Sequence, residues 1–297
     1  MNRVGKMSFV QTLRSLRPRL QFAALTHELP AVVEGLRQMG VGTIIDFAME
    51  HRPAAESAHV AHVIASRLNE FPSAMHALKL SALGSAENHS RAEAFARGIV
   101  RRAAELDTAV CIDAEENALH TAYAKTAFGL MERYNAKSVD RTEGKLPVVF
   151  KTYQMYRADS LDELKKDIEL SKELGFELGA KLVRGAYLRM DRNTGALLPN
   201  KAMVDKSYEL GLEAALRNGN DHVTTLVATR NVANIEQALE HENSDRVLYA
   251  QLLGMDDDLT NRLLEQKVKV LKYVPFGRLK ELSPYLYRRL LERLSWS

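Results

Sequence analysis

The sequence predicts an α/β fold, a single (β/α)8 barrel that follows an N-terminal helical arm. Eight apolar runs of strand length alternate with eight helical patterns along the chain. Strands that are apolar throughout and alternate with helices are typical of a parallel sheet covered on both sides. Eight such units in about 250 residues favour a closed barrel over the main alternative, a doubly wound open sheet.

The predicted elements follow one another without a linker or a low-complexity tract. The strands are expected at 41–47, 75–80, 108–112, 147–153, 178–183, 223–228, 247–252 and 268–274. The helices are expected at 54–68, 90–105, 117–134, 161–174, 202–216, 232–239, 259–266 and 279–294. Helix 161–174 has early acids at Asp162 and Glu163 and is closed by Gly175. We therefore divide the chain into an arm, residues 1–38, and one barrel, residues 39–297.

The arm is basic at its start. Residues 1–27 hold no acid before Glu28, and they carry apolar residues at roughly helical spacing beside five Lys and Arg side chains, at positions 3, 6, 14, 17 and 19. This pattern fits an amphipathic arm that packs on the barrel or touches a membrane surface. An organelle transit peptide is the alternative.

Composition excludes several classes of protein. Lys and Arg exceed Asp and Glu by 41 − 38 = 3, and no basic block accompanies this balance, so we expect no nucleic-acid partner. A single cysteine, Cys111, cannot form an internal disulfide. No apolar run approaches the ~20 residues that a membrane span needs. A zinc-binding His-Glu-x-x-His motif is absent, and we expect no metal.

Two charged residues stand at the carboxyl ends of predicted strands, where barrels of this kind place their active sites. Lys79 lies between two leucines, so its ammonium needs an anion, either a protein carboxylate or a substrate. Asp113 follows the next strand and is placed to pair with Lys79 across the mouth. The alternative for Lys79 is a buried structural ion pair. Glu115 and Glu116 are expected to be structural, because first-turn acids complement a helix dipole.

The fifth strand ends with two cations, Lys181 and Arg184, followed by Gly185 and Tyr187. A glycine there would let a bulky ligand approach the backbone, and the cations suit a phosphate or a reduced flavin. An ordinary strand-to-loop turn is the alternative.

The last predicted helix carries Tyr285, Arg288, Arg289 and Glu292 at i, i+3, i+4 and i+7, hence on one side. Two guanidinium groups can hold one carboxylate in a fixed orientation. A solvated basic helix end is the alternative.

From about residue 40 to its end, the chain resembles the proline dehydrogenase family. The motifs that carry the resemblance occur in the family's order: Lys79-Leu-Ser-Ala-Leu, Ile112-Asp-Ala-Glu-Glu, Thr152-Tyr-Gln, Lys181-Leu-Val-Arg-Gly-Ala-Tyr-Leu, Gln251-Leu-Leu-Gly-Met, Lys272-Tyr-Val-Pro-Phe-Gly and Tyr285-Leu-Tyr-Arg-Arg-Leu-Leu-Glu.

This resemblance implies a distorted barrel that holds FAD non-covalently and oxidises L-proline to 1-pyrroline-5-carboxylate by hydride transfer. It implies catalytic roles for Asp113, Lys181 and Tyr273. It assigns the substrate to Lys79, Ala114, Tyr187, Leu253, Tyr285, Arg288 and Arg289, of which Lys79 and the two arginines would grip the carboxylate. It assigns the cofactor to Val149, Lys151, Lys181, Val183, Gly185, Ala186, Lys201, Thr229, Arg230, Asn231, Gln251 and Glu292.

The chain departs from the family pattern at two of these positions. Arg230 stands where the family usually has histidine, and Lys151 replaces the common Gln or Asn. We expect Lys151 beside the flavin ring, where a cation would raise the flavin's potential. Weakened cofactor binding is the alternative at both positions.

The resemblance also implies a quinone as electron acceptor and peripheral membrane contact. The expected location is the cytoplasm for a bacterial protein, and the mitochondrial matrix or inner membrane for a eukaryotic one. Three other functions remain open: a hydroxyproline dehydrogenase, which the bulk of Tyr273 disfavours; a Schiff-base lyase or aldolase that uses Lys79 or Lys272; and a catalytically silent binding protein.

Overall fold

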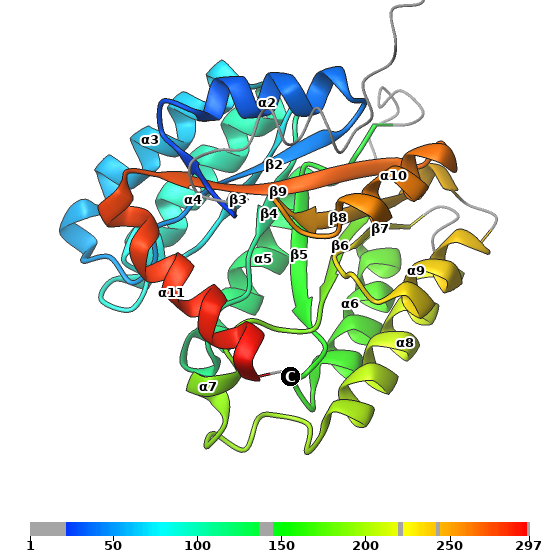
Figure 1. The fold of residues 1–297 in the computed structure, drawn as a ribbon. Coiled ribbons are helices and arrows are strands. Elements are labelled where there is room, and N and C mark those ends of the chain that lie inside the picture. Colours follow the sequence, from blue (N-terminus) through cyan, green and yellow to red (C-terminus); the bar gives the residue numbers. More distant parts are fainter. Residues whose placement is uncertain (1–21, 137–144, 219–221, 242–243, 296–297) are drawn as a thin grey trace, which may run out of the picture.

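The computed structural model describes residues 22–136, 145–218, 222–241 and 244–295, and side chains of the last helix as far as Arg288. Its centre is a closed parallel barrel (Figure 1). The strands are β2 (Gly42–Phe47), β3 (Met75–Leu78), β4 (Val110–Ile112), β5 (Val149–Gln154), β6 (Leu178–Val183), β7 (Val223–Val227), β8 (Val247–Leu252) and β9 (Lys269–Gly277). Strand β9 pairs with both β8 and β2, which closes the barrel. The barrel prediction is confirmed, and the open sheet is wrong.

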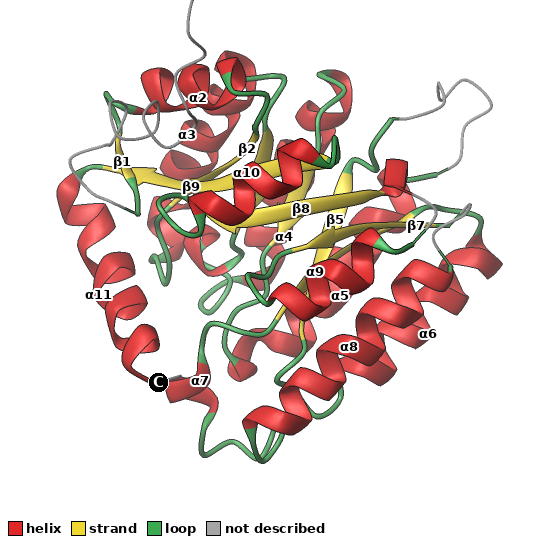
Figure 2. Cartoon of the chain, turned by 45° about the vertical axis from the view of Figure 1, so that its right-hand side comes forward, coloured by secondary structure: helices red, strands yellow, loops and turns green. Residues whose placement is uncertain are grey.

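Helices cover the outside of this barrel (Figure 2). They are α3 (Ser57–Glu70), α4 (His89–Glu105), α5 (His120–Tyr134), α6 (Ser160–Leu174), α8 (Lys201–Arg217), α9 (Val232–Leu239) and α10 (Asp257–Glu265), and the last helix, α11 (Leu279–Ser295), follows β9. The predicted starts at residues 54 and 117 are short 3-10 turns, Ala54–Glu56 and Asn117–Leu119. Gly175 ends α6 with a φ of 74°, a left-handed conformation that suits glycine. A further short helix, α7 (Leu188–Asp191), was not predicted.

The N-terminal part of the described chain joins the barrel. Strand β1 (Ala24–Leu25) pairs with the end of β9, and helix α2 (Leu29–Gln38) follows it. The apolar face of α2 is buried in the main core through Leu29, Val32 and Leu36. The basic residues of the arm precede residue 22 and lie outside the described residues, and the boundary at residue 38 stays a prediction.

The barrel interior has two layers. Nearer the amino ends of the strands, inward-facing residues form a separate apolar cluster that includes Ile44, Phe150 and Leu271. Two residues further along the same strands, the inward positions are polar: Asp46, Thr152 and Tyr273. Because side chains alternate along a strand, this step of two keeps them facing inward. The polar layer therefore rests on an apolar floor.

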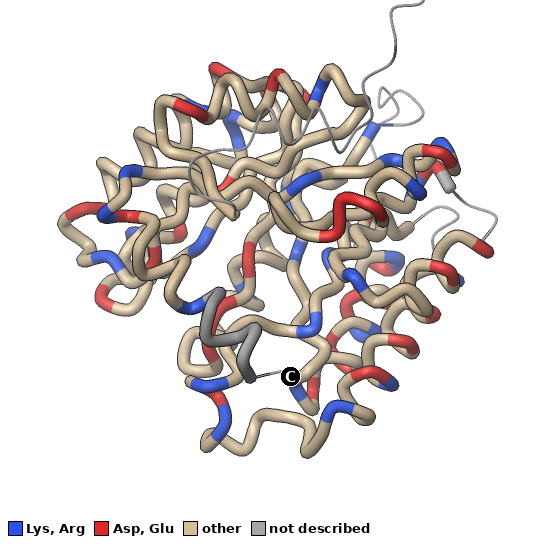
Figure 3. The backbone as a smooth tube through the Cα atoms, in the orientation of Figure 1, with Lys and Arg blue, Asp and Glu red and all other residues tan. Residues whose placement is uncertain are grey.

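Charge on the outer helices is mixed, with Lys and Arg interleaved with Asp and Glu (Figure 3). No helix in the described ranges is both long enough and apolar enough to cross a membrane.

Candidate active site

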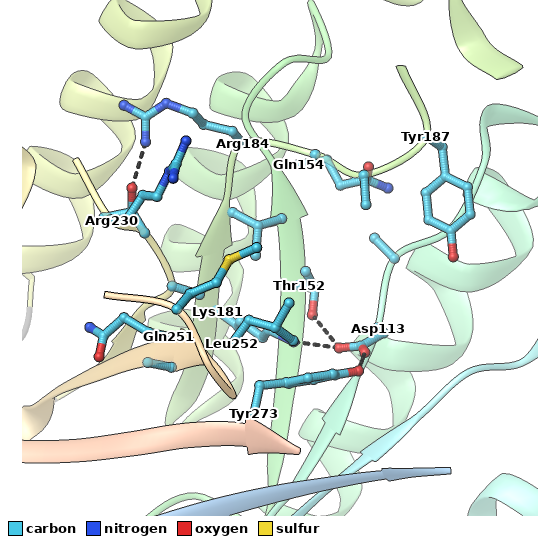
Figure 4. Close-up of a pocket in the computed structure, with 18 of the residues that line it drawn as sticks. Asp113, Thr152, Gln154, Lys181, Arg184, Tyr187, Arg230, Gln251, Leu252 and Tyr273 are labelled. Carbon is cyan, nitrogen blue, oxygen red and sulfur yellow. Dashed lines mark hydrogen bonds and ion pairs between the residues drawn. The ribbon is translucent and has the colours of Figure 1, made fainter. Parts of the chain in front are cut away.

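A cavity of about 360 Å³ opens at the carboxyl ends of the strands (Figure 4). Residues from β3 to β9, the turn after β2 and helix α11 line it. Among them are the predicted site residues Lys79, Asp113, Ala114, Lys181, Val183, Gly185, Ala186, Tyr187, Thr229, Arg230, Gln251, Tyr273 and Tyr285. The structure thus brings most of the predicted residues to one place, although what they bind stays a prediction.

Asp113 is the centre of a buried polar network. Its Oδ1 lies 2.5 Å from Lys181 Nζ, and the Tyr273 hydroxyl donates to its Oδ2 at 2.6 Å. Burial alone would raise the pKa of Asp113, but the ammonium groups of Lys181 and Lys79 outweigh it and lower that pKa. Burial raises the pKa of Tyr273 far above its usual value, and the Asp113 carboxylate adds to this effect. Both shifts favour an ionised Asp113 carboxylate beside a neutral Tyr273 hydroxyl.

Lys79 is held by protein carboxylates. Its Nζ donates to Asp46 Oδ1, lies 3.2 Å from the Tyr273 hydroxyl and 3.8 Å from Asp113 Oδ2. The predicted Lys79–Asp113 pairing is confirmed, but Asp46 is the nearer partner and was missed. Its signal was present, because Asp46 is a charge within the apolar run Ile44-Ile45-Asp46-Phe47, as Lys79 is in its own strand. Burial would lower the pKa of Lys79, yet Asp46 and Asp113 raise it above its usual value, which keeps the cation charged.

A second acid that the sequence analysis did not identify, Glu50, lines the cavity at its mouth. Glu50, in the turn after β2, forms an ion pair with Arg288 of α11 and accepts a hydrogen bond from the Tyr187 hydroxyl at 3.2 Å. The Arg288 guanidinium also lies 5.3 Å from the centre of the Tyr187 ring. Helix α11 therefore lies across the mouth, and Tyr285 of the same helix faces the cavity. The side chains of Arg289 and Glu292 lie outside the described residues.

The opposite end of the cavity holds two arginines that differ in their contacts (Figure 4). Arg184 donates to Asp205 at 3.0 Å, and to Thr229 and Asn234. It ties the end of β6 to the start of α8 and α9. Arg230 forms no ion pair with any other residue that the structure describes.

Two buried amide atoms at the cavity have no hydrogen-bond partner among the described groups, Oε1 of Gln154 and Nε2 of Gln251. Buried polar groups are normally satisfied, so a bound ligand with both donors and acceptors would complete them. The flavin ring of FAD offers both, and the diphosphate of FAD suits the cation of Arg230. The residues present therefore fit FAD. Gln154 lies in a quoted motif, but we did not assign it a role from the sequence.

The side chains of two predicted cofactor residues point away from the cavity. Val149 and Lys151 point from β5 toward the helices, where Lys151 Nζ pairs with Glu163 at 2.9 Å and Asp167 at 2.6 Å. The inward residues of β5 are Phe150, Thr152 and Gln154. The prediction that Lys151 lies beside a flavin ring is wrong, because strand alternation turns its side chain outward.

Gly185 was expected to let a ligand approach the backbone, but in the structure it makes room for the Tyr156 ring. Its φ is 134°, and a Cβ there would lie 1.5 Å from the ring of Tyr156. The close neighbour is thus a protein side chain instead of a ligand.

Arg288 does not line the cavity itself, and neither do four other predicted or considered residues. Lys201 is exposed and pairs with Asp205, and Asn231 caps α9 through Asn234. Leu253 is buried in the main core. Lys272 of β9 donates to the carbonyl of Met255 at 2.6 Å, and burial lowers the pKa of Lys272.

Comparisons with known proteins identify the family of this chain. Residues 31–295 match the family model described as proline dehydrogenase. Human mitochondrial proline dehydrogenase 1 is 31% identical over 215 residues, 66% of this chain and 34% of that protein. Rat hydroxyproline dehydrogenase is 31% identical over 247 residues, 77% of this chain and 53% of that protein.

A solved structure, proline utilization A from Bdellovibrio bacteriovorus inactivated by N-propargylglycine, superposes with a TM-score of 0.78. It is 18% identical and covers 94% of this chain and 32% of the other, so it supports the fold alone. The chain spans about a third to a half of the length of these curated relatives. The extent of the family match leaves one conclusion: this chain belongs to the proline dehydrogenase family.

Proposed function

We propose that this chain oxidises L-proline to 1-pyrroline-5-carboxylate by hydride transfer to FAD. The observation that carries the proposal is the buried cluster of Lys79, Asp113, Lys181 and Tyr273 in the cavity, whose lining residue Glu50 pairs with Arg288, in a chain of the proline dehydrogenase family.

The cations would bind the carboxylate of the substrate. Lys79 has three N–H donors and uses two of them on Asp46 and the Tyr273 hydroxyl, so one remains for a ligand. Arg288 and Arg289 would supply the other contacts from α11. Such fixed contacts hold a substrate at contact distance from its reaction partner, which contributes much of the acceleration in this kind of catalysis.

FAD, when bound, supplies the acceptor for the hydride. Gln154, Gln251 and Arg230 are the residues that we expect to hold it, because they present unsatisfied or unpaired groups to the cavity. Asp113 and Tyr273 would fix the ring of the substrate and exclude water without exchanging a proton.

The Schiff-base alternative lacks a suitable lysine. A Schiff base needs a neutral amine, whereas the carboxylates around Lys79 raise its pKa and keep it charged. Lys272 has a lowered pKa, but it does not line the cavity and donates a hydrogen bond to the Met255 carbonyl.

Hydroxyproline is the second candidate substrate, since rat hydroxyproline dehydrogenase matches 77% of this chain and human proline dehydrogenase 1 matches 66%. We favour proline because the Tyr273 hydroxyl already lies between Asp113 and Lys79. A substrate hydroxyl at that place would have to displace it.

The family resemblance further supports a quinone as the electron acceptor, peripheral membrane contact, and a mitochondrial location if the source is eukaryotic. Proteins from human and Caenorhabditis elegans that match the chain are named mitochondrial.

The test is the visible spectrum of the purified protein under anaerobic conditions. Flavin bands that bleach with L-proline, and much less with trans-4-hydroxy-L-proline, support the proposal. A protein that remains colourless after incubation with FAD contradicts it.

Arg288→Met tests the carboxylate contact separately. Losing one charged partner typically costs about 2–5 kcal/mol, so we expect the proline KM to rise at least thirtyfold with normal flavin content. Arg97→Met removes an arginine of α4 that pairs only with Glu93 on the surface, and it serves as the control. An unchanged KM in Arg288→Met contradicts the assignment.

A further inference from the structure

A buried acid lies just outside the cavity and has no role in the proposed chemistry. Glu115 follows β4 two residues after Asp113 and is only 2% exposed. It does not line the cavity, and it has no ion-pair partner among the residues that the structure describes. Buried charged groups are rarely left without a cation, so this carboxyl needs an explanation.

Both oxygens of Glu115 are used by one residue, Ser81. The Ser81 backbone N–H donates to Oε2 at 2.9 Å, and the Ser81 hydroxyl is hydrogen-bonded to Oε1. Gln154 donates to the backbone carbonyl of Glu115 at 2.7 Å, which fixes the main chain at the same point. Ser81 is 1% exposed, so the whole contact is sealed from solvent.

Ser81 in turn holds the turn after β2. Its hydroxyl oxygen accepts from the His51 backbone N–H at 3.0 Å, and its carbonyl accepts from the Arg52 backbone N–H at 3.0 Å. His51 has a φ of 49°, a left-handed conformation that is unfavourable for a residue with a side chain. Such a conformation persists only where the surroundings enforce it.

This turn carries Glu50, which holds Arg288 and Tyr187 at the mouth of the cavity. A chain of hydrogen bonds thus runs from Glu115 through Ser81 to the turn that presents Glu50. Glu115, Ser81 and His51 follow three different strands, so their contacts could not be predicted from the sequence alone.

We propose that Glu115 and Ser81 are positioning residues: they hold the strained turn at His51 so that Glu50 sets the place of Arg288 over the substrate. The inference rests on the proposed function, because Arg288 is taken to bind the substrate carboxylate. Glu115 acts as a neutral acid: its Oε2 accepts from the Ser81 backbone N–H, and the proton on its Oε1 lies in the hydrogen bond with the Ser81 hydroxyl oxygen.

The charges around Glu115 agree with a neutral carboxyl. Burial raises its pKa to about 8, and the nearby acids Glu50 and Glu116 add to the effect. His51 faces Glu116 at 3.5 Å and does not reach Glu115. Above pH 8 the carboxyl loses its proton, and a third negative charge then lies beside Glu50 and Glu116. We expect that charge to weaken the hold on the turn.

The experiment compares four variants by steady-state kinetics with L-proline. Glu115→Ala and Ser81→Ala should raise the proline KM at least about fivefold, the loss expected when a buried hydrogen bond is broken, with kcat changed less than about threefold. Glu115→Gln imitates the neutral acid and should restore a KM near that of the wild type. Asn88→Ala removes a helix-capping hydrogen bond of α4 at a residue that does not line the cavity, and it is the control for a general loss of stability.

The dependence of the proline KM on pH is a second test. In the wild type the KM should rise above pH 8 relative to Glu115→Gln, which cannot ionise. Equal pH profiles for the two proteins, or a KM in Ser81→Ala equal to that of Asn88→Ala, would overturn the inference. The bleaching of the wild-type flavin by L-proline is measured first. A wild type that fails this test contradicts the proposed function, independently of the roles of Glu115 and Ser81. If Glu115→Ala does not fold, Ser81→Ala and Glu115→Gln still decide the question.

Discussion

Lys151 and Lys181 lie on adjacent strands of the same barrel wall, one register step apart, yet they face opposite ways. Thr152 pairs in register with Lys181, and Lys151 pairs with Ala180. Lys181 points into the cavity and binds Asp113, whereas Lys151 points outward and binds Glu163 and Asp167 of α6. Both lysines are buried and paired with carboxylates, so burial and charge do not distinguish them.

The alternation of side chains along a strand makes the difference. A shift of one residue moves a side chain from the catalytic face to the structural face. An outward lysine then stabilises the attachment of a helix, and an inward lysine sets the charge of a cavity. The same chemistry at neighbouring positions therefore has two consequences, and substitutions on the two faces separate them.

The largest effect is expected for Asp113→Asn on the inner face. This variant leaves Lys181 without its ionised partner, and breaking a buried pair costs about 3–5 kcal/mol. We expect flavin reduction by L-proline, measured by anaerobic stopped-flow absorbance, to slow at least a hundredfold. Asp167→Asn on the outer face is the matched control and should lower the melting temperature without slowing reduction. Equal slowing in both variants would contradict the distinction between the faces.

Lys151→Met should reduce stability and leave the chemistry intact. It leaves Glu163 and Asp167 without their shared cation, and we expect the free energy of unfolding to fall by about 3 kcal/mol in urea titrations. The flavin spectrum and the proline KM should not change. A shifted flavin potential would revive the expectation that this lysine lies near the flavin.

The acid side of the stability profile should depend on Glu163. Burial would raise the pKa of Glu163, but hydrogen bonds from His120 and Lys151 and the charge of Lys151 lower it to about 2. A lowered folded pKa adds stability above pH 4.5, and this stability is lost as the pH falls toward 2. The loss amounts to at most about 3 kcal/mol. In Glu163→Gln, urea midpoints measured from pH 5 to pH 2.5 should fall less steeply than in the wild type, and parallel curves would count against the assignment.

The smallest effect is expected for Lys201→Ala. The side chain is 61% exposed and contacts Asp205, so we expect stability to change by less than about 0.5 kcal/mol. Flavin affinity, measured by fluorescence titration of the apoprotein, should stay the same because Lys201 does not line the cavity. A clear loss of affinity would restore the cofactor role that the family resemblance implied.

The sequence was enough to predict the barrel, because its strands are continuous apolar runs at regular spacing. It also indicated Lys79, Asp113 and Lys181, since each is a charge at the end of such a run. Whether a residue faces inward depends on register to within one position, and the predicted strand 147–153 could not fix the direction of Lys151.

Partners distant in the sequence were harder to predict. Asp46 and Lys79 are 33 positions apart, and only the pairing of β2 with β3 brings them together. Glu50 lies in an irregular turn, where no periodic pattern marks a functional side chain. The role of Gly185 depends on the ring of Tyr156, which arrives from another segment.

The close contact between Gly185 and the Tyr156 ring also restricts which substitutions this chain can accept during evolution. Any other residue at 185 would collide with the ring, so a smaller residue must first replace Tyr156. That replacement removes the hydroxyl that donates to Asp191 at 2.8 Å, the same aspartate that accepts from the Asn117 backbone. We therefore expect Gly185, Tyr156 and Asp191 to be retained together or replaced together during evolution.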